Sequence, residues 1–228
     1  ARAGHHVLLV DLDPQAHLTL HVGVDPEEVE NSIYDLLVDD ETSAFDVARH
    51  LSPKLGLLPA EVNLAGAESE LAGKLATGQA QRILATKCQP LIEQHAFDYV
   101  LIDCPPSLGV LSINALTLAN EVFVPMQAHY LALQGLSKLL ETVSFIHQSF
   151  NPALSVTGVV LCMHEQQTIL SKEVVGDLEA FFEGARGSGH PWAQGDVLSP
   201  PIRRNIKLAE SPSFGQTIFD YAPASNGA

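Results

Sequence analysis

The sequence has few cysteines and no long apolar run, and each scarcity removes a class of protein. The three cysteines, Cys88, Cys104 and Cys162, lie far apart and form no CxxC pair, so neither a zinc site nor a disulfide framework is predicted. No run of about 18 uncharged apolar residues occurs, so no membrane span is expected. The first residues lead directly into an apolar strand without the features of a signal peptide. A reducing, cytoplasmic location fits these absences.

Basic residues are scarce as well, since 12 Lys and Arg stand against 27 Asp and Glu, and the formal net charge is −15. A surface of this charge repels nucleic acid and anionic lipid on average. Charge can still be concentrated locally, and Arg203, Arg204 and Lys207 fall in one short stretch. The ten histidines include the adjacent His5 and His6 but no HExxH-like spacing, so we interpret them as surface or packing residues.

Several short apolar runs rich in Val, Ile and Leu are separated by segments with a helical period. The runs lack the alternation of half-exposed strands, which predicts strands buried on both faces of a mostly parallel sheet. Helices between such strands favour an α/β fold with helices on both faces. With 228 residues, of which 46% are hydrophobic, one domain over residues 1–228 is expected. The expected strands are Val7–Val10, Tyr99–Ile102, Val122–Val124 and Val156–Cys162, the expected helices are Leu64–Leu75, Gln79–Gln94, Leu131–Phe150 and Leu170–Phe182, and the main loop is Gly184–Gly195.

The first candidate site is the sequence VDLDPQ, in which Asp11 and Asp13 directly follow a predicted buried strand. Open α/β folds bind ligands at the carboxyl ends of their parallel strands. Alternate residues of an extended strand share a side, so both carboxylates could face one site. The alternative is that Asp13 is only the N-cap of a following helix that begins near Pro14.

The second candidate site is YVLIDCPPS, where four apolar residues precede Asp103. This is the Walker B arrangement, which places one carboxylate at the sheet edge, where it can hold Mg²⁺, usually through water. The following prolines, Pro105 and Pro106, stiffen the loop and remove backbone donors. Cys104 is interpreted as a small packed residue rather than a nucleophile, because nothing near it in the sequence would lower its pKa.

The third candidate site is PPIRRNIKLAESPSFG, residues 200–215. Its arginines and lysine could contact the phosphates of a DNA backbone without reading base sequence. The alternative is a solvated turn of helix, which composition alone favours.

Taken together and in this order, the motifs resemble the ParA/Soj family of deviant-Walker P-loop ATPases over nearly the whole chain. This family is related to MinD. The segments that carry the resemblance are Val7–Gln15, Val24–Glu27, Ser32–Leu37, Phe97–Gly109, Val124–Gln127, Tyr130–Gly135, Gly158–Val175 and Arg204–Ser213.

The resemblance implies roles for the acidic residues and the loop after the second strand. Asp13 would position or activate the attacking water, and Asp11 would sit beside the phosphates and Mg²⁺. Asp103 would be the Walker B carboxylate and would hold Mg²⁺, largely through water. Pro105 and Pro106 would shape the switch loop that senses the γ-phosphate of ATP.

The resemblance also implies an adenine site and a DNA-contacting face. Met163 would lie near the adenine together with the segment Ile202–Asn205, which includes Arg203 and Asn205. Arg204 and Lys207 would match basic positions near the face that contacts DNA. Family members form an ATP-dependent homodimer that binds DNA non-specifically and is stimulated by a ParB-type partner, which would associate the protein with the bacterial nucleoid.

Three features depart from the family pattern. The Gly-rich phosphate-binding loop and its strand, about 30 residues of a βα unit, do not precede Val7, so we expect the chain as given to bind ATP poorly or not at all. Because the chain has no initiator Met and its last residues are typical of a turn before a helix, we also expect a fragment trimmed at both ends. The net charge of −15 is unfavourable for a non-specific DNA binder. Arg203 stands where the family commonly has proline.

Two other functions stay open from the sequence. One is a non-catalytic ParA-like binding module that lacks the phosphate-binding loop. The other is a MinD-like positioning ATPase, which a basic amphipathic helix after Ala228 would favour. The segment RNIKLAESPS favours the ParA branch.

Overall fold

The computed structural model describes residues 1, 3–75, 78–164 and 169–228, and these residues form two compact units. The first unit comprises Ala1–Leu118 and Glu210–Tyr221, and the second comprises Ala119–Ala209 and Ala222–Ala228. Each unit is described by itself. The expectation of a single domain over residues 1–228 stays a prediction.

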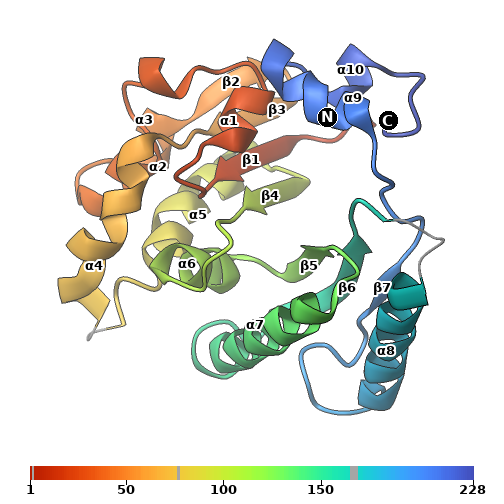
Figure 1. The fold of residues 1–228 in the computed structure, drawn as a ribbon. Helices are drawn as coiled ribbons and strands as arrows, with labels where there is room; N and C mark the ends of the chain where they lie inside the picture. The colour runs from red at the N-terminus through yellow and green to blue at the C-terminus, as the bar shows by residue number, and fades with distance from the viewer. Residues whose placement is uncertain (2, 76–77, 165–168) are drawn as a thin grey trace. The chain divides into compact units, whose positions relative to one another are not determined.

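The first unit is built on a four-stranded sheet in the order β2-β3-β1-β4. Strand β1 (Val7–Asp11) pairs in parallel with β3 (Leu55–Leu58) on one side and with β4 (Tyr99–Asp103) on the other (Figure 1). Strand β2 (Arg49–Ser52) pairs antiparallel with the outer edge of β3. Because β1 lies in the middle, its Leu8 and Val10 are fully buried, as its run of branched apolar residues predicts.

Short helices connect and cover these strands. The apolar sides of α2, α4, α5 and α6 join β1 in one core, in which Leu36, Leu71, Leu84 and Leu111 are buried. Helix α2 begins with a capping box. The Ser32 side chain accepts from the backbone N–H of Asp35, and the Asp35 side chain accepts from the backbone N–H of Ser32. The helices of this unit are α1 (His17–His21), η1 (Pro26–Glu28), α2 (Ile33–Val38), α3 (Ala44–Val47), η2 (Val62–Gly66), α4 (Ala67–Leu75), α5 (Ile83–His95), α6 (Val110–Leu118), η3 (Ser211–Phe214) and α10 (Ile218–Tyr221).

The second unit contains a parallel sheet in the order β5-β6-β7. Its strands are β5 (Glu121–Met126), β6 (Ser155–Leu161) and β7 (Asp196–Leu198), and its helices are α7 (Tyr130–Ser149), α8 (Ile169–Ala185) and α9 (Ile206–Glu210), the last of which ends at the start of the first unit. Helix α8 packs against β7. The apolar stripe of α7, which includes Leu140 and Val143, is buried.

The predicted α/β class, with mostly parallel strands and helices on both faces, is confirmed (Figure 1). All four predicted strands are present, and the predicted helices Leu131–Phe150 and Leu170–Phe182 match α7 and α8 to within a few residues. Strands β2, β3 and β7 were not predicted, because runs of three or four residues give too little pattern. The predicted helix at Gln79–Gln94 begins later, at Ile83, and part of the expected segment Gly158–Val175 lies outside the described residues.

The prediction that every strand is buried on both faces is wrong for two of them. In β4, Tyr99 is 53% exposed and Leu101 is 54% exposed, and in β5 Phe123 is 52% exposed. The exposed residues alternate along each strand, so one face of β4 and one face of β5 lack a covering layer. Each of these strands also has a single strand partner among the described residues. An edge strand with exposed apolar side chains is a surface on which a further strand can pair.

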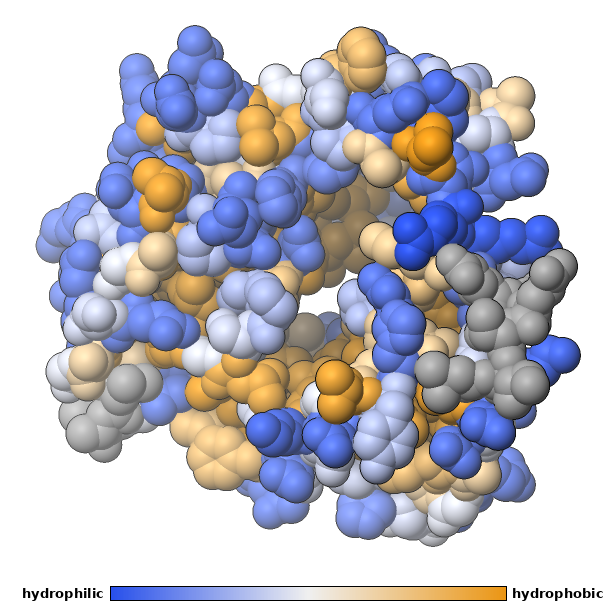
Figure 2. All heavy atoms as spheres, viewed as in Figure 1, coloured by the Kyte–Doolittle hydropathy of each residue, from blue (hydrophilic) through white to orange (hydrophobic). Residues whose placement is uncertain are grey.

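Hydrophilic residues predominate on the face of the molecule in Figure 2, with apolar residues scattered between them in small groups. This distribution agrees with the excess of acidic residues in the sequence. Within the part of the chain that the structure describes, no helix combines the length and apolar character needed to cross a membrane.

The pairing of β6 with β7 leads to a stability prediction at Gly158, which has φ of +152°. A β-carbon built on Gly158 would overlap the carbonyl oxygen of Asp196 in β7. Gly158→Ala should therefore lower the free energy of unfolding by about 2–3 kcal/mol, as measured by urea denaturation. The matched control is Gly176→Ala in the interior of α8, where a β-carbon meets nothing within 4 Å. This control should raise stability by about 0.5–1 kcal/mol, and equal effects of the two changes would contradict the prediction.

Candidate functional site

Two aspartates end neighbouring parallel strands of the first unit. Asp11 at the end of β1 is in register with Asp103 at the end of β4, and the backbone N–H of Leu12 donates to the carbonyl oxygen of Asp103 at 2.9 Å. The carboxyl ends of parallel strands are the edge at which open α/β folds bind ligands. The structure thus brings together the first and second candidate sites of the sequence.

Asp11 is fully buried, and hydrogen bonds within the protein occupy its carboxylate. Its Oδ2 accepts from the backbone N–H of Thr19 at 2.8 Å and from the Thr19 hydroxyl at 2.7 Å. Its Oδ1 accepts from the backbone N–H of Asp13 at 3.2 Å. Three donors on one buried carboxylate favour a role in holding the loop over direct contact with a metal ion. The catalytic and Mg²⁺ roles implied for Asp11 stay predictions.

Asp13 is half-buried and lies in a tight turn after β1. Its Oδ1 accepts from the backbone N–H of Gln15 at 2.9 Å, and its carbonyl oxygen accepts from the N–H of Ala16 at 2.8 Å. The alternative that Asp13 caps the next helix is wrong, because the N-cap of α1 is Ala16, with φ of +51° and no side-chain cap. Asp13 is thus a carboxylate at the sheet edge that is not used up in helix capping.

The three carboxylates influence one another electrostatically. Burial, and then the negative charges of Asp11 and Asp13, raise the pKa of Asp103. Burial also raises the pKa of Asp11, and the hydrogen bonds from Thr19 oppose this effect. Burial and the same carboxylates raise the pKa of the Cys104 thiol to about 12. A thiol of this pKa is protonated near neutral pH, which agrees with the interpretation that Cys104 is not a nucleophile.

The loop that contains Pro105 and Pro106 joins Asp103 to helix α6. The Ser112 hydroxyl of α6 donates to the carbonyl oxygen of Ser107, which ties the end of this loop to the helix. The loop therefore starts at the acidic edge and ends on a buried helix.

Among the described residues, no group of three or more His, Cys, Asp or Glu side chains is arranged to hold a metal ion. This arrangement does not fit zinc, which takes four protein ligands in structural sites and three in catalytic ones. It fits Mg²⁺, which keeps several waters and takes one or two carboxylates together with substrate phosphates. The Mg²⁺ role of Asp103, which lies at a strand end that solvent reaches, stays a prediction.

A second group of predicted residues lies at the carboxyl ends of the strands in the second unit. Met163 follows β6 with φ of +48°, which is uncommon for a residue other than glycine. Its sulfur accepts from the Gln127 amide at 3.4 Å. The backbone N–H of His164 donates to the carbonyl oxygen of Ile202 at 3.0 Å, and His164 forms a bridge with Arg203. The structure thus places Ile202 and Arg203 beside the residue that follows Met163. The predicted contact of this segment with adenine stays a prediction.

The basic residues predicted to contact DNA also belong to the second unit. Arg203, Arg204 and Lys207 are all exposed around the start of α9. The side chain of Asn205 accepts from the backbone N–H of Lys207 at 2.8 Å, as an N-cap residue does. Both the DNA-contacting face and the alternative of a solvated helix turn agree with this exposure, and the choice between them stays a prediction.

Two polar residues of these sites escaped the sequence analysis. Thr19 contacts Asp11 from eight positions along the chain, and Gln127 contacts Met163 from a different strand. For Thr19 a signal was available, because a hydroxyl residue between two leucines of α1 is a candidate partner for a buried carboxylate. For Gln127 only the pairing of β5 with β6 reveals the contact.

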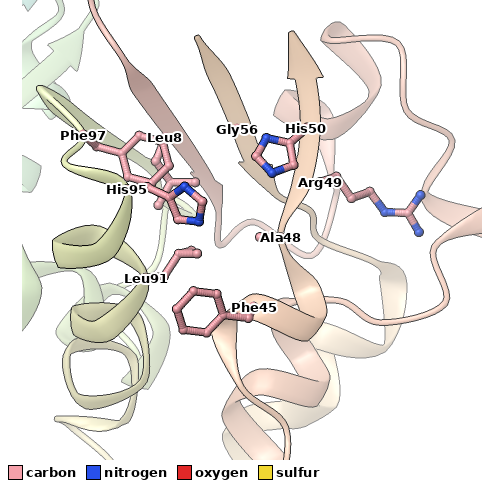
Figure 3. Close-up of a pocket in the computed structure, with 9 residues that line it drawn as sticks. All are labelled: Leu8, Phe45, Ala48, Arg49, His50, Gly56, Leu91, His95 and Phe97. Atoms are coloured by element: carbon pink, nitrogen blue, oxygen red, sulfur yellow. The ribbon is translucent and has the colours of Figure 1, made fainter. Parts of the chain in front are cut away.

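A separate hollow of about 200 Å³ lies in the first unit (Figure 3). The His95 ring lies close to the rings of Phe45, His50 and Phe97, at centroid distances of 6.2, 6.0 and 5.7 Å. None of the predicted site residues lines the hollow. Its lining consists of Leu8, Phe45, Ala48, Arg49, His50, Gly56, Leu91, His95 and Phe97.

Comparisons with known proteins define first the class of domain and then the family. A family model described as an AAA domain (AAA_31) matches residues 1–156. The chain is 37% identical over 228 residues to the sporulation initiation inhibitor protein Soj of Bacillus subtilis, covering 100% of the chain and 84% of that protein. It is 38% identical over 228 residues to the chromosome-partitioning ATPase Soj of Thermus thermophilus, covering 100% of the chain and 81% of that protein. The chain therefore belongs to the ParA/Soj family.

A solved structure supports the same fold. The cobyrinic acid a,c-diamide synthase of Mycobacterium smegmatis, with bound ATP analog and magnesium, matches the chain with a TM-score of 0.75 and 34% identity. The match covers 94% of this chain and 82% of that chain.

The clustered carboxylates lead to a prediction about pH and stability. A carboxyl group whose pKa is raised by folding binds more protons in the folded state, so its ionisation disfavours folding as the pH rises from the ordinary aspartate range through the raised pKa. Asp103→Asn removes this ionisation and should raise the melting temperature at pH 7 by a few degrees. The difference from the unmodified protein should shrink as the pH falls toward about 4.

The control for this prediction is Asp98→Asn in the same unit. The backbone N–H of His6, which donates to the Asp98 carboxylate at 2.8 Å, lowers the pKa of Asp98. Ionised Asp98 therefore favours folding, and its replacement should leave the melting temperature at pH 7 unchanged or lower. An Asp103→Asn protein that melts below the unmodified protein at pH 7 would contradict the proposed repulsion.

Proposed function

We propose that this chain carries the catalytic edge of a ParA-type ATPase that partitions chromosomes or plasmids. The observation that carries the proposal is the register of Asp11 with Asp103, with Asp13 in the turn beside them. The names of the relatives agree with it, since the Thermus protein is a chromosome-partitioning ATPase. The AAA domain match over residues 1–156 covers all three aspartates.

In this proposal Asp13 orients the water that attacks the γ-phosphate of ATP. The support is its position, since it is half-buried at the strand edge, with Oδ1 engaged by Gln15 and no hydrogen bond on Oδ2 among the described residues. A carboxylate oxygen of this kind can accept a hydrogen bond from water and hold it for an in-line displacement. Asp11 fixes the turn and Asp103 lies next to it.

ATP and Mg²⁺ are the ligands of this proposed site. Asp103 would hold Mg²⁺, largely through water, and the ion would neutralise charge on the phosphates during transfer. The loop with Pro105 and Pro106 would respond to the γ-phosphate, because it begins at Asp103. Met163, Arg203 and Asn205, all in the second unit, would contact the adenine.

The phosphates also require backbone amides and lysines of a Gly-rich loop. We propose that such a loop and its strand come before Val7 in the full-length protein and that the strand pairs with β4. The sheet order supports this proposal, because β4 has a single strand partner among the described residues and its other edge is open to a further strand. This arrangement favours the catalytic alternative over a non-catalytic binding module.

The proposed protein forms an ATP-dependent homodimer that binds DNA non-specifically and responds to a ParB-type partner. Arg204 and Lys207 would contact DNA phosphates, since both are exposed at the start of α9. A local basic edge can bind phosphates despite the net charge of −15, because charges beyond about 10 Å are largely screened at 0.1 M salt. Such binding would place the protein in the cytoplasm at the bacterial nucleoid.

The catalytic assignment predicts the behaviour of Asp13→Ala in the full-length protein. ATP binding should stay within a few-fold of the unmodified protein, as measured by equilibrium titration. Phosphate release should fall by about 10²–10⁴-fold, which is the usual contribution of a positioned acid or base. Unchanged turnover would remove Asp13 from the catalytic role.

The control is Asp25→Ala. Asp25 makes the same local bond as Asp13, since its Oδ1 accepts from the backbone N–H of Glu27 at 3.0 Å, but it lies at η1, outside the acidic edge. Loss of turnover in both variants would attribute the effect to the local turn rather than to the site.

The DNA assignment predicts that Arg204→Ala combined with Lys207→Ala weakens binding similarly for all DNA sequences. Loss of two phosphate contacts should reduce the slope of log affinity against log salt by about 2. The control is Lys138→Ala with Lys172→Ala, which removes two exposed positive charges from α7 and α8. If the affinity and salt slope of the Arg204 and Lys207 variant equal those of the unmodified protein, the segment is a solvated helix turn.

A further inference from the structure

Thr19 lies in α1 and is fully buried. Its hydroxyl group both donates and accepts a hydrogen bond. The hydroxyl donates to Asp11 Oδ2 at 2.7 Å and accepts from the backbone N–H of Ala60 at 3.1 Å. The Thr19 backbone N–H donates to the same Asp11 oxygen at 2.8 Å. One side chain thus connects the end of β1, helix α1 and the chain after β3.

The other oxygen of the Asp11 carboxylate extends this connection to Asp13, whose backbone N–H it accepts at 3.2 Å. Asp11 therefore bridges Thr19 and Asp13. The turn between them is also fixed by the bond from Leu12 to Asp103 and by the bond from Ala16 back to Asp13. A rotation of the Asp11 carboxylate would move the backbone of Asp13, and the Thr19 hydroxyl is a bond that opposes such a rotation.

The energetics favour this interpretation. Hydrogen bonds to an ionised carboxylate are about twice as strong as those between neutral groups. Valine has nearly the shape of threonine but cannot donate or accept, so Thr19→Val would leave both a buried carboxylate oxygen and the Ala60 N–H without this partner. Serine keeps the hydroxyl and loses only a methyl group.

We propose that Thr19 is a positioning residue for the reaction, acting through Asp11 to hold the turn that presents Asp13. This inference rests on the proposed ATPase function, in which Asp13 orients the attacking water. Thr19 is fully buried and bonds Asp11 directly, so it acts on the reaction through Asp11. Displacements of about 1 Å in a catalytic group can cost about 100-fold in rate.

The test uses steady-state ATP hydrolysis by the full-length protein. For Thr19→Val, kcat should fall by about 10–100-fold, while KM for ATP stays within about threefold. Thr19→Ser should recover most of kcat, because the hydroxyl is restored. The control is Thr42→Val, which removes a similar bond from a Thr hydroxyl to Asp39 at 2.6 Å on an exposed loop and should leave kcat unchanged.

A second measurement does not depend on turnover. In the nucleotide-free protein, amide hydrogen exchange at Asp13, Gln15 and Ala16 should be faster in Thr19→Val and return to the unmodified rate in Thr19→Ser. In a double-mutant cycle, Thr19→Val should have little further effect on kcat when Asp11→Asn is already present.

The outcomes separate the inference from the function on which it rests. An unmodified full-length protein that does not hydrolyse ATP would overturn the proposed function. An active unmodified protein whose kcat is unaffected by Thr19→Val would overturn only the role of Thr19. If Thr19→Val does not fold, Thr19→Ser and Thr19→Cys decide, because they share one shape and differ in the strength of the donor, and equal kcat values in this pair would overturn the inference.

Discussion

The parallel pairing of β1 with β4 is the interaction on which the candidate site depends. It sets Asp11 opposite Asp103 and continues for one further bond, from Leu12 to the carbonyl oxygen of Asp103. A shift of this register by one residue would turn the carboxylate of one strand to the opposite face. The side chains of β1 hold the register through packing, since Leu8 and Val10 are fully buried in the core of the first unit.

This pairing concentrates negative charge at a partly buried edge, which disfavours ionisation of both strand-end aspartates. The protein offsets the charge of Asp11 with donors from Thr19 and Asp13, whereas the backbone of Cys104 bonds the Asp103 carboxylate at the strand end. Asp11 is therefore suited to holding the turn, and Asp103 is suited to a ligand that brings positive charge.

The carboxyl-terminal part of the chain contributes to both units. In the second unit, Ile202 and Arg203 pair with His164, the residue after Met163. In the first unit, η3 packs against α1. Helix α1 is the element anchored by Thr19 to Asp11. The sequence motif RNIKLAESPS therefore begins with exposed basic residues and ends in η3, which contacts α1. The contact between α1 and η3 joins the beginning of the described chain to its carboxyl-terminal part.

The sequence by itself determined the α/β class, four of the strands, the two longest helices and the two strand-end aspartates, because branched apolar runs and helical periods are local patterns. The order of motifs determined the family. Only the tertiary structure decided that Asp13 is not a helix cap, that Asp11 is occupied by Thr19, and that one face of β4 and one face of β5 are exposed. It also supplied the short strands β2, β3 and β7. These features depend on which segments pair in space, and hydrogen bonds between residues far apart in the chain leave no periodic trace in the sequence.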